Sequence, residues 1–503
     1  MLRKVKTENG WVEGIEAADP RITAFKGVPY AAPPVGENRW RAPQPCKDWE
    51  GVLKAYRFAP ISMQHIPGED VDNLYSREWN VDPTIEQSED SLVLNIWTPA
   101  KSADEKLPVF VWYFGGGLRE GSTAEMEFDG ERLARRGIIV VTVNYRLAAF
   151  GFLCHPEITK ESPEFPGNFG YLDQRFGTMW VKRNIAAFGG DPDNITIGGQ
   201  SAGGGSVMAQ MASPLNKGLF NRCIVDSGLG QVPYPPSFFR PPLSIEEAEK
   251  EGEKFFEELG VKTLEEARAL DAFYIRDKMA VSKARFAVIN DGNFLVKTPD
   301  DAFMANEGNI VPVLFGHTSS EFPSAPPAST VAEFKEYAEK TFGADAPEFL
   351  KLCESKTGSI KEMMYKAQVQ HLEYSVRLVG RKKAASGNRI PMYYWVFDPE
   401  IPGWDNPGTF HSSDLWFFFE TLAKCWRPFV GKHYDLARLM CNYWANFIKC
   451  GDPNGKDANG EDMPFWAPYT DENPTRMWFG DTAYTENKGP SELVEFLLKN
   501  GMK

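Results

Sequence analysis

The sequence predicts an α/β fold in which a central, mostly parallel sheet is flanked by helices. Short apolar runs rich in β-forming residues alternate with longer helical or irregular stretches, which is the order of elements in such folds. The run Ile-Ile-Val-Val-Thr-Val at 138–143 lacks strict polar alternation, as strands buried on both faces do. We therefore expect buried strands at 109–114, 138–143, 195–197, 223–225, 311–315 and 393–397.

A charged, helical stretch interrupts this pattern in the second half of the chain. Ser244-Ile-Glu-Glu and Thr263-Leu-Glu-Glu both fit the capping box that starts a helix, and Gly260 fits the end of the first one. We expect helical insertions within about residues 240–390. The length of 503 residues alone would allow two or three domains, but no repeat or linker separates them.

The composition excludes several classes of function. Lys and Arg total 55 against 69 Asp and Glu, so no basic surface is expected to bind nucleic acid. No apolar run approaches the roughly 20 residues of a membrane-spanning helix, and no membrane association is expected. Seven scattered cysteines without a C-x-x-C pair predict neither a disulfide scaffold nor a metal site. The N-terminus lacks the apolar stretch of a signal peptide, which favours a cytoplasmic protein, with secretion possible if a signal peptide has been removed.

The strongest local motif is Gly199-Gln200-Ser201-Ala202-Gly203, which follows the predicted strand at 195–197. A sharp strand-to-helix turn of this kind strains the serine backbone and requires small neighbours, and it presents the hydroxyl clear of the sheet. The helix that follows directs its amides toward developing negative charge. A lone motif of this type usually marks an ordinary turn, but its position after a strand favours Ser201 as a nucleophile.

A second glycine cluster, Gly115-Gly116-Gly117, directly follows the predicted strand at 109–114. Glycines let backbone amides approach a reacting carbonyl closely, and a pair of such amides can stabilise an oxyanion. An ordinary glycine turn is the alternative. Together with the serine turn, the cluster predicts an oxyanion hole formed by the amides of Gly116, Gly117 and Ala202.

A serine nucleophile needs a base, and the base needs an acid that fixes its tautomer. In α/β-hydrolases the order along the chain is Ser, acid, His, which leaves His411 and His433 as candidates. His411 lies in a polar loop after the strand at 393–397, whereas His433 begins what reads as an ordinary surface helix. Glu321 follows the strand at 311–315, at the strand edge where catalytic groups gather, but the residues alone leave it one acid among 69.

At these motifs the chain closely resembles the type-B carboxylesterase family, which includes bacterial para-nitrobenzyl esterases and cholinesterases. The resemblance runs nearly end to end, through matches at 25–36, 88–95, 144–147, 167–174, 188–192, 199–203, 316–321, 408–415 and 451–454. It implies an α/β-hydrolase fold with a single catalytic domain over residues 1–503, and no metal or organic cofactor. It also implies a triad of Ser201, Glu321 and His411, oxyanion amides at Gly116, Gly117 and Ala202, and an ion pair between two further residues, Arg39 and Glu89.

Three departures from the family pattern are visible. Ser91 stands where many secreted members have a cysteine whose partner would lie near Ser62, so that disulfide is missing and an intracellular bacterial-type enzyme is favoured. Phe114 replaces the histidine that often precedes the three glycines, and catalysis is expected to survive this change. Gln200 replaces the usual glutamate and removes a buried charge, which is expected to shift the pH optimum.

These residues predict a serine carboxylesterase acting on small to medium apolar or aryl esters through an acyl-enzyme. Phe114, Leu118, Trp416 and Phe419 are candidates for an apolar substrate pocket, with packing beneath the sheet as the alternative. Its partner would be a small-molecule ester, and the protein would be a monomer or weak homo-oligomer. The alternative function is a catalytically inactive, cholinesterase-like binding module, although such relatives lose triad residues that this chain keeps.

Overall fold

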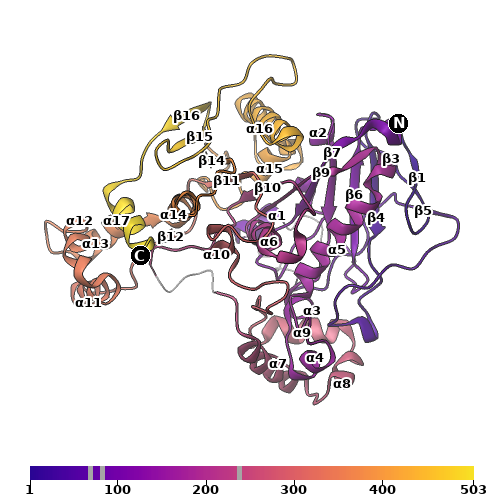
Figure 1. Cartoon of the computed structure of the whole chain (residues 1–503), viewed down its shortest axis with the longest axis horizontal. Helices are drawn as coiled ribbons and strands as arrows, with labels where there is room; N and C mark the ends of the chain where they lie inside the picture. Colours follow the sequence, from indigo (N-terminus) through magenta and orange to yellow (C-terminus); the bar gives the residue numbers. More distant parts are fainter. Residues whose placement is uncertain (66–71, 80–84, 235–240) are drawn as a thin grey trace.

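The computed structural model describes residues 1–65, 72–79, 85–234 and 241–503 (Figure 1). Within this part of the chain, an 11-stranded mixed sheet forms the centre of the molecule. In spatial order its strands are β16 (Ala483–Asn487), β15 (Thr475–Phe479), β14 (Met392–Phe397), β11 (Val313–Thr318), β10 (Arg222–Asp226), β9 (Gly190–Gln200), β7 (Leu107–Tyr113), β8 (Ile139–Val143), β6 (Val93–Thr98), β4 (Thr23–Pro29) and β3 (Ile15–Glu16).

The middle of this sheet is parallel, as the sequence predicts. Strands β15, β14, β11, β10, β9, β7 and β8 pair in parallel, and the strands toward the two edges are antiparallel. All six strands expected from the apolar runs are present, although β9 begins five residues earlier than expected. Two small sheets accompany it, formed by β1 (Lys4–Lys6), β2 (Trp11–Glu13) and β5 (Val52–Lys54), and by β12 (Pro323–Ser324) and β13 (Val369–Gln370).

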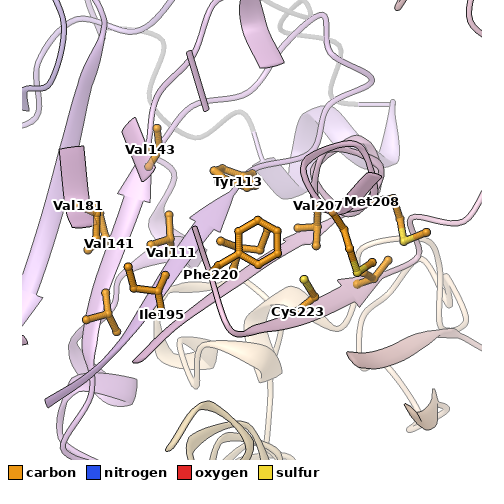
Figure 2. Close-up of a cluster of buried hydrophobic side chains, with 14 of the residues drawn as sticks. Val111, Tyr113, Val141, Val143, Val181, Ile195, Val207, Met208, Phe220 and Cys223 are labelled. Atoms are coloured by element: carbon orange, nitrogen blue, oxygen red, sulfur yellow. The ribbon is translucent and has the colours of Figure 1, made fainter. Parts of the chain in front are cut away.

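Helices cover both faces of the sheet, so its strands are buried on two sides. Along β7, Val109, Val111 and Tyr113 join one core while Phe110 and Trp112 join the other. Figure 2 shows the first core, in which valines of the strands meet Val207 and Met208 of a covering helix. That face is covered by α5 (Phe169–Asn184), α6 (Ala202–Ala212), α10 (Pro299–Met304) and α14 (His371–Ala385), and the other by α2 (Glu131–Ala134), α15 (Leu415–Phe418) and α16 (Gly431–Cys450).

The expected helical insertions lie between β10 and β14 and form two groups at the periphery (Figure 1). Helix α7 (Ile245–Leu259) begins after the capping box of Ser244 and ends at Gly260, which adopts the left-handed conformation. Thr263 caps α8 (Leu264–Arg268) with a capping box of the same kind. The remaining helices are α1 (Leu74–Trp79), α3 (Ala148–Phe152), α4 (Pro156–Glu161), α9 (Ala272–Val281), α11 (Val331–Phe342), α12 (Ala346–Leu352), α13 (Ile360–Ala367) and α17 (Glu492–Gly501).

Two contacts near the N-terminus bear on the departures seen in the sequence. Arg39 forms the expected ion pair with Glu89, a bidentate contact with N–O distances of 2.6 and 2.7 Å between nearly buried side chains. Ser62 and Ser91 lie side by side with their hydroxyl oxygens 3.0 Å apart. A hydrogen bond between two serines therefore joins the two positions at which many secreted family members are expected to carry a disulfide.

Over the described ranges, every helix is too short or too polar to cross a lipid bilayer.

Candidate active site

Ser201 occupies a strained turn between β9 and α6. Its backbone has φ 55° and ψ −124°, a conformation that a residue with a side chain rarely adopts. The flanking glycines make the turn possible, since a Cβ on Gly199 would lie 2.4 Å from the Gly203 backbone. A Cβ on Gly203 would lie 2.1 Å from the Tyr113 carbonyl oxygen. The sequence motif therefore reflects close backbone packing that holds the serine at the end of β9.

The structure brings His411 and Glu321 to the same sheet edge as Ser201. Nε2 of His411 lies 2.8 Å from Oγ of Ser201, and Nδ1 of His411 lies 2.6 Å from Oε2 of Glu321. Glu321 follows β11 and His411 follows β14, and these strands run parallel to β9 with β10 between. Their carboxyl ends consequently deliver three distant residues to one hydrogen-bonded chain.

The electrostatics of this chain favour an ionised acid beside the histidine. Burial opposes ionisation of Glu321, but the charge and hydrogen bond of His411 and a hydrogen bond from Ser227 hold its pKa at about 2. Burial also opposes protonation of His411, yet Glu321 and then Asp414 raise the pKa of the imidazole above its usual value. The carboxylate is thus available to stabilise an imidazolium that forms during a reaction.

His433 does not belong to this site, and its expected surface position is wrong. It is 3% exposed, lies within α16, and its Nε2 contacts the Glu400 carbonyl oxygen at 3.1 Å. Its Nδ1 accepts a hydrogen bond from the Val430 amide and so closes the start of the helix. Of the two histidine candidates, it is His411 that lies within hydrogen-bonding distance of Ser201.

The glycine loop lies directly against the serine turn. A Cβ on Gly115 would approach the Ser201 Cβ to 3.2 Å, and Gly116 and Gly117 have φ values of 90° and 64°. Within the described part of the chain, the amides of Gly116, Gly117 and Ala202 donate to no protein acceptor. All three residues line the same cavity as the serine, so these amides are available to a ligand.

The site opens into a cavity of about 2490 Å³, and only part of the expected substrate pocket lines it. Leu118 lies on the cavity wall as expected. Phe114, Trp416 and Phe419 do not, because each is at most 1% exposed and packs in the core. Phe114 stacks on Tyr145, Trp416 stacks on Trp79 and Phe419 packs against Trp112. The aromatic wall instead comes from Phe58, Tyr75, Trp79, Phe128, Tyr171, Phe286 and Phe322.

A buried carboxyl pair, Asp226 and Asp414, lies behind the site and was not assigned a role from the sequence. Both side chains are inaccessible, and burial raises the pKa of each. The charge of Asp414 raises the pKa of Asp226 further, whereas the charge of Glu321 adds to the rise at Asp414. Oγ of Ser227 lies 2.6 Å from Glu321 and 3.2 Å from Asp226. The Ser227 hydroxyl donates its single hydrogen to Glu321, at the shorter distance. In the longer contact, protonated Asp226 is therefore the donor and Ser227 Oγ the acceptor. The position of Asp414 three residues after His411 was the available sequence signal.

Gln200 is the departure that lies closest to the chemistry. Its amide nitrogen is 3.4 Å from Nε2 of His411, on the side of the ring that faces Ser201. The side chain is 2% exposed and therefore fixed in position.

No group of His, Cys, Asp and Glu side chains in the described ranges is arranged to hold a metal ion.

Comparison with known proteins identifies the family. The profile described as "Carboxylesterase family" matches residues 2–496, nearly the whole chain. The protein belongs to the carboxylesterase family. It is thus a carboxylic ester hydrolase with the α/β-hydrolase fold, and the type-B resemblance seen in its motifs is confirmed.

Individual carboxylesterases resemble this one to different extents. Fumonisin B1 esterase of Sphingopyxis macrogoltabida is 37% identical over 468 residues, which are 89% of this chain and 82% of that protein. Para-nitrobenzyl esterase of Bacillus subtilis (strain 168) is 30% identical over 517 residues, covering 98% of both chains. A solved PNB esterase structure superposes with a TM-score of 0.79 at 28% identity and covers 99% of both chains. The Geobacillus stearothermophilus carboxylesterase EST55 gives 0.74 at 29% identity, covering 98% of this chain and 99% of that one.

Proposed function

We propose that this carboxylesterase cleaves esters through an acyl-enzyme on Ser201, with His411 as general base and Glu321 as the acid that orients it. The observation that carries the proposal is the continuous contact from Ser201 Oγ to His411 at 2.8 Å and from His411 to Glu321 at 2.6 Å. The side on which the carboxylate lies fixes Nδ1 as the protonated ring nitrogen, which leaves Nε2 free to accept a proton.

In the first half of the reaction, Ser201 Oγ attacks the ester carbonyl carbon while its proton passes to Nε2 of His411. The negative charge on the carbonyl oxygen is stabilised by the amides of Gly116, Gly117 and Ala202. The imidazolium then gives its proton to the leaving alkoxide oxygen, and the C–O bond breaks. In the second half, His411 takes a proton from water, whose oxygen attacks the acyl carbon, and Ser201 recovers the proton as the acid leaves.

The substrates that suit this site are small to medium apolar or aryl esters. The cavity wall combines aromatic rings with Leu118 beside the glycine loop, and its volume exceeds that of most small-molecule sites. Because a single sheet extends from β3 near the N-terminus to β16 near the C-terminus, we treat residues 1–503 as one catalytic domain. We propose that this domain works as a monomer or weak homo-oligomer, which size-exclusion chromatography with light scattering tests.

The test is hydrolysis of para-nitrophenyl esters of increasing acyl length, and of aryl esters, by wild type and Ser201→Ala. We expect wild-type turnover and a fall of Ser201→Ala by about 10⁶-fold, to the background rate. Circular dichroism and thermal unfolding must show that both proteins are folded. Folded wild type that is inert toward every ester would overturn the proposal and favour a binding module.

A further inference from the structure

The cavity wall that begins at the glycine loop carries a group of carboxylates. Residues 115–128 form one continuous stretch, nearly all of which lines the cavity, and it contains Glu120, Glu125 and Glu127. The stretch ends in a short 3-10 helix, Met126–Phe128. All three acids thus follow the proposed oxyanion hole within about ten residues of chain, and they line the same cavity.

Glu127 is the most deeply buried of these acids and is firmly placed. It is 1% exposed although it contributes to the cavity wall. Its carbonyl oxygen accepts a hydrogen bond of 3.1 Å from Thr421, and the adjacent Phe128 packs against Trp112 and Phe419. Oε1 of Glu127 nevertheless receives a hydrogen bond from no donor in the described residues. A buried carboxyl oxygen without a donor bears a desolvation cost, which a hydrogen-bond donor on a ligand would offset.

Glu125 adds a second carboxyl group beside it. Its Oε1 accepts a hydrogen bond of 2.5 Å from the Ser122 amide, and its side chain lies within hydrogen-bonding reach of Glu127. Burial, followed by mutual repulsion for Glu127, raises the pKa of both acids. When both are ionised, the pair holds two negative charges, one on the partly exposed Glu125 and one on the buried Glu127.

Cationic side chains in the described ranges do not neutralise this pair. Neither Glu125 nor Glu127 forms an ion pair there with Lys, Arg or His. The neighbouring Glu78 differs, because Arg427 binds it through Nε at 2.9 and 3.0 Å and both side chains are inaccessible. Burial raises the pKa of Glu120, the third acid of the wall, and the positive charges of His65 and Arg119 oppose this rise.

We propose that the Glu125–Glu127 pair binds an ammonium group with N–H donors, and that the enzyme therefore favours esters that carry a primary or secondary amine. Such a group supplies what the pair lacks, namely a positive charge and a hydrogen-bond donor for Oε1 of Glu127. This inference rests on the proposed ester hydrolysis, because it names a feature of the substrate. A quaternary ammonium has no N–H and would leave that oxygen without a donor.

The test compares three reversible ligands of equal chain length: n-hexylammonium, 1-hexanol and hexyltrimethylammonium. Each inhibits hydrolysis of para-nitrophenyl butyrate at about pH 8.5, where the amine stays charged and the carboxyl pair is more fully ionised. We expect n-hexylammonium to inhibit at about tenfold lower concentration than either analogue. In Glu127→Gln and Glu125→Gln this preference should fall about tenfold, and calorimetric binding to Ser201→Ala should repeat the order.

The matched control is Glu86→Gln, which removes an exposed carboxylate that lines the same cavity. It should keep the preference, because its charge is screened by water. Equal inhibition by hexanol and n-hexylammonium in wild type would overturn the inference, as would equally tight hexyltrimethylammonium binding. The inference would also be overturned if the preference for n-hexylammonium survived in both Glu125→Gln and Glu127→Gln, or if Glu86→Gln removed it too. Failure of wild type to hydrolyse para-nitrophenyl butyrate would instead refute the proposed function.

Discussion

Replacing Gln200 by glutamate should shift the acid limb of the pH–activity profile upward. As the pH is lowered, the variant should lose activity at a higher pH than wild type does. In the proposed mechanism His411 must be neutral to accept the proton of Ser201, so the acid limb of kcat/KM should follow the pKa of its imidazole. The Gln200 amide lies 3.4 Å from Nε2 of that ring. This amide does not favour protonation of His411, because its N–H donor would face the N–H that an imidazolium carries on Nε2. A carboxylate in the same place would accept that N–H and add an attractive charge.

The magnitude follows from the distance between the two side chains. Opposite unit charges 3.4 Å apart at an effective dielectric constant of about 20 attract each other by about 5 kcal/mol. At about 1.36 kcal/mol per unit, this attraction sets an upper limit near 3.6 pKa units. The new carboxylate would be buried, as Gln200 is at 2% exposure, and burial opposes its own ionisation. We therefore expect the acid limb to move upward by about 1 to 3 pH units.

The assay is kcat/KM for a neutral para-nitrophenyl ester measured across the pH range. Gln231→Glu is a matched control, because Gln231 also lines the cavity but has no hydrogen bond to His411. Its acid limb should stay close to that of wild type. An acid limb that does not move in Gln200→Glu, or that moves as far in Gln231→Glu, would refute a direct interaction between position 200 and the histidine.

Three further changes test other parts of the structure. Gly116→Ala should lower kcat by about 10²- to 10³-fold, because a Cβ there would lie 2.1 Å from a carbonyl oxygen, whereas Gly205→Ala has its nearest contact at 3.8 Å and should keep wild-type kcat. The double variant Ser62→Cys, Ser91→Cys should form a disulfide, since the hydroxyls are 3.0 Å apart, and gain about 3 kcal/mol in urea unfolding that a reductant abolishes. For Asp414→Asn, the difference in Tm between the variant and wild type should be more favourable to the variant at pH values above the ordinary carboxyl range than below it. The raised pKa of this buried acid means that the folded wild type is stabilised by the protonated form, which is lost as pH rises. The same Tm difference at low and at high pH would contradict this.

The sequence predicted the parts of the molecule that depend on local pattern. Apolar runs such as 138–143 gave the buried strands, because a strand covered on both faces must be apolar throughout. The capping box at Ser244 and the glycine at 260 marked both ends of α7. The serine turn was visible because close backbone contacts permit only glycine at 199 and 203.

Side-chain direction and burial could not be predicted in the same way. Phe114 is next to the glycine loop in sequence, but alternation along the chain directs it into the core against Tyr145. Trp416 follows the histidine loop, yet its ring lies beneath the cavity and donates to Glu78 at 3.1 Å. The pairing of Asp226 with Asp414 joins residues 188 positions apart, and nothing local to either one signals the other.

In the proposed mechanism, the positions of the three triad residues along the chain also determine when activity can first appear during synthesis. Ser201, Glu321 and His411 follow β9, β11 and β14, which lie in one contiguous block with β10 between the first two. A ribosome must therefore deliver more than four-fifths of the 503 residues before the last member of this block and its histidine leave the exit tunnel. No shorter nascent fragment contains all three groups. Ester cleavage in a translation reaction would accordingly report near-complete chains and ignore earlier, partly folded ones.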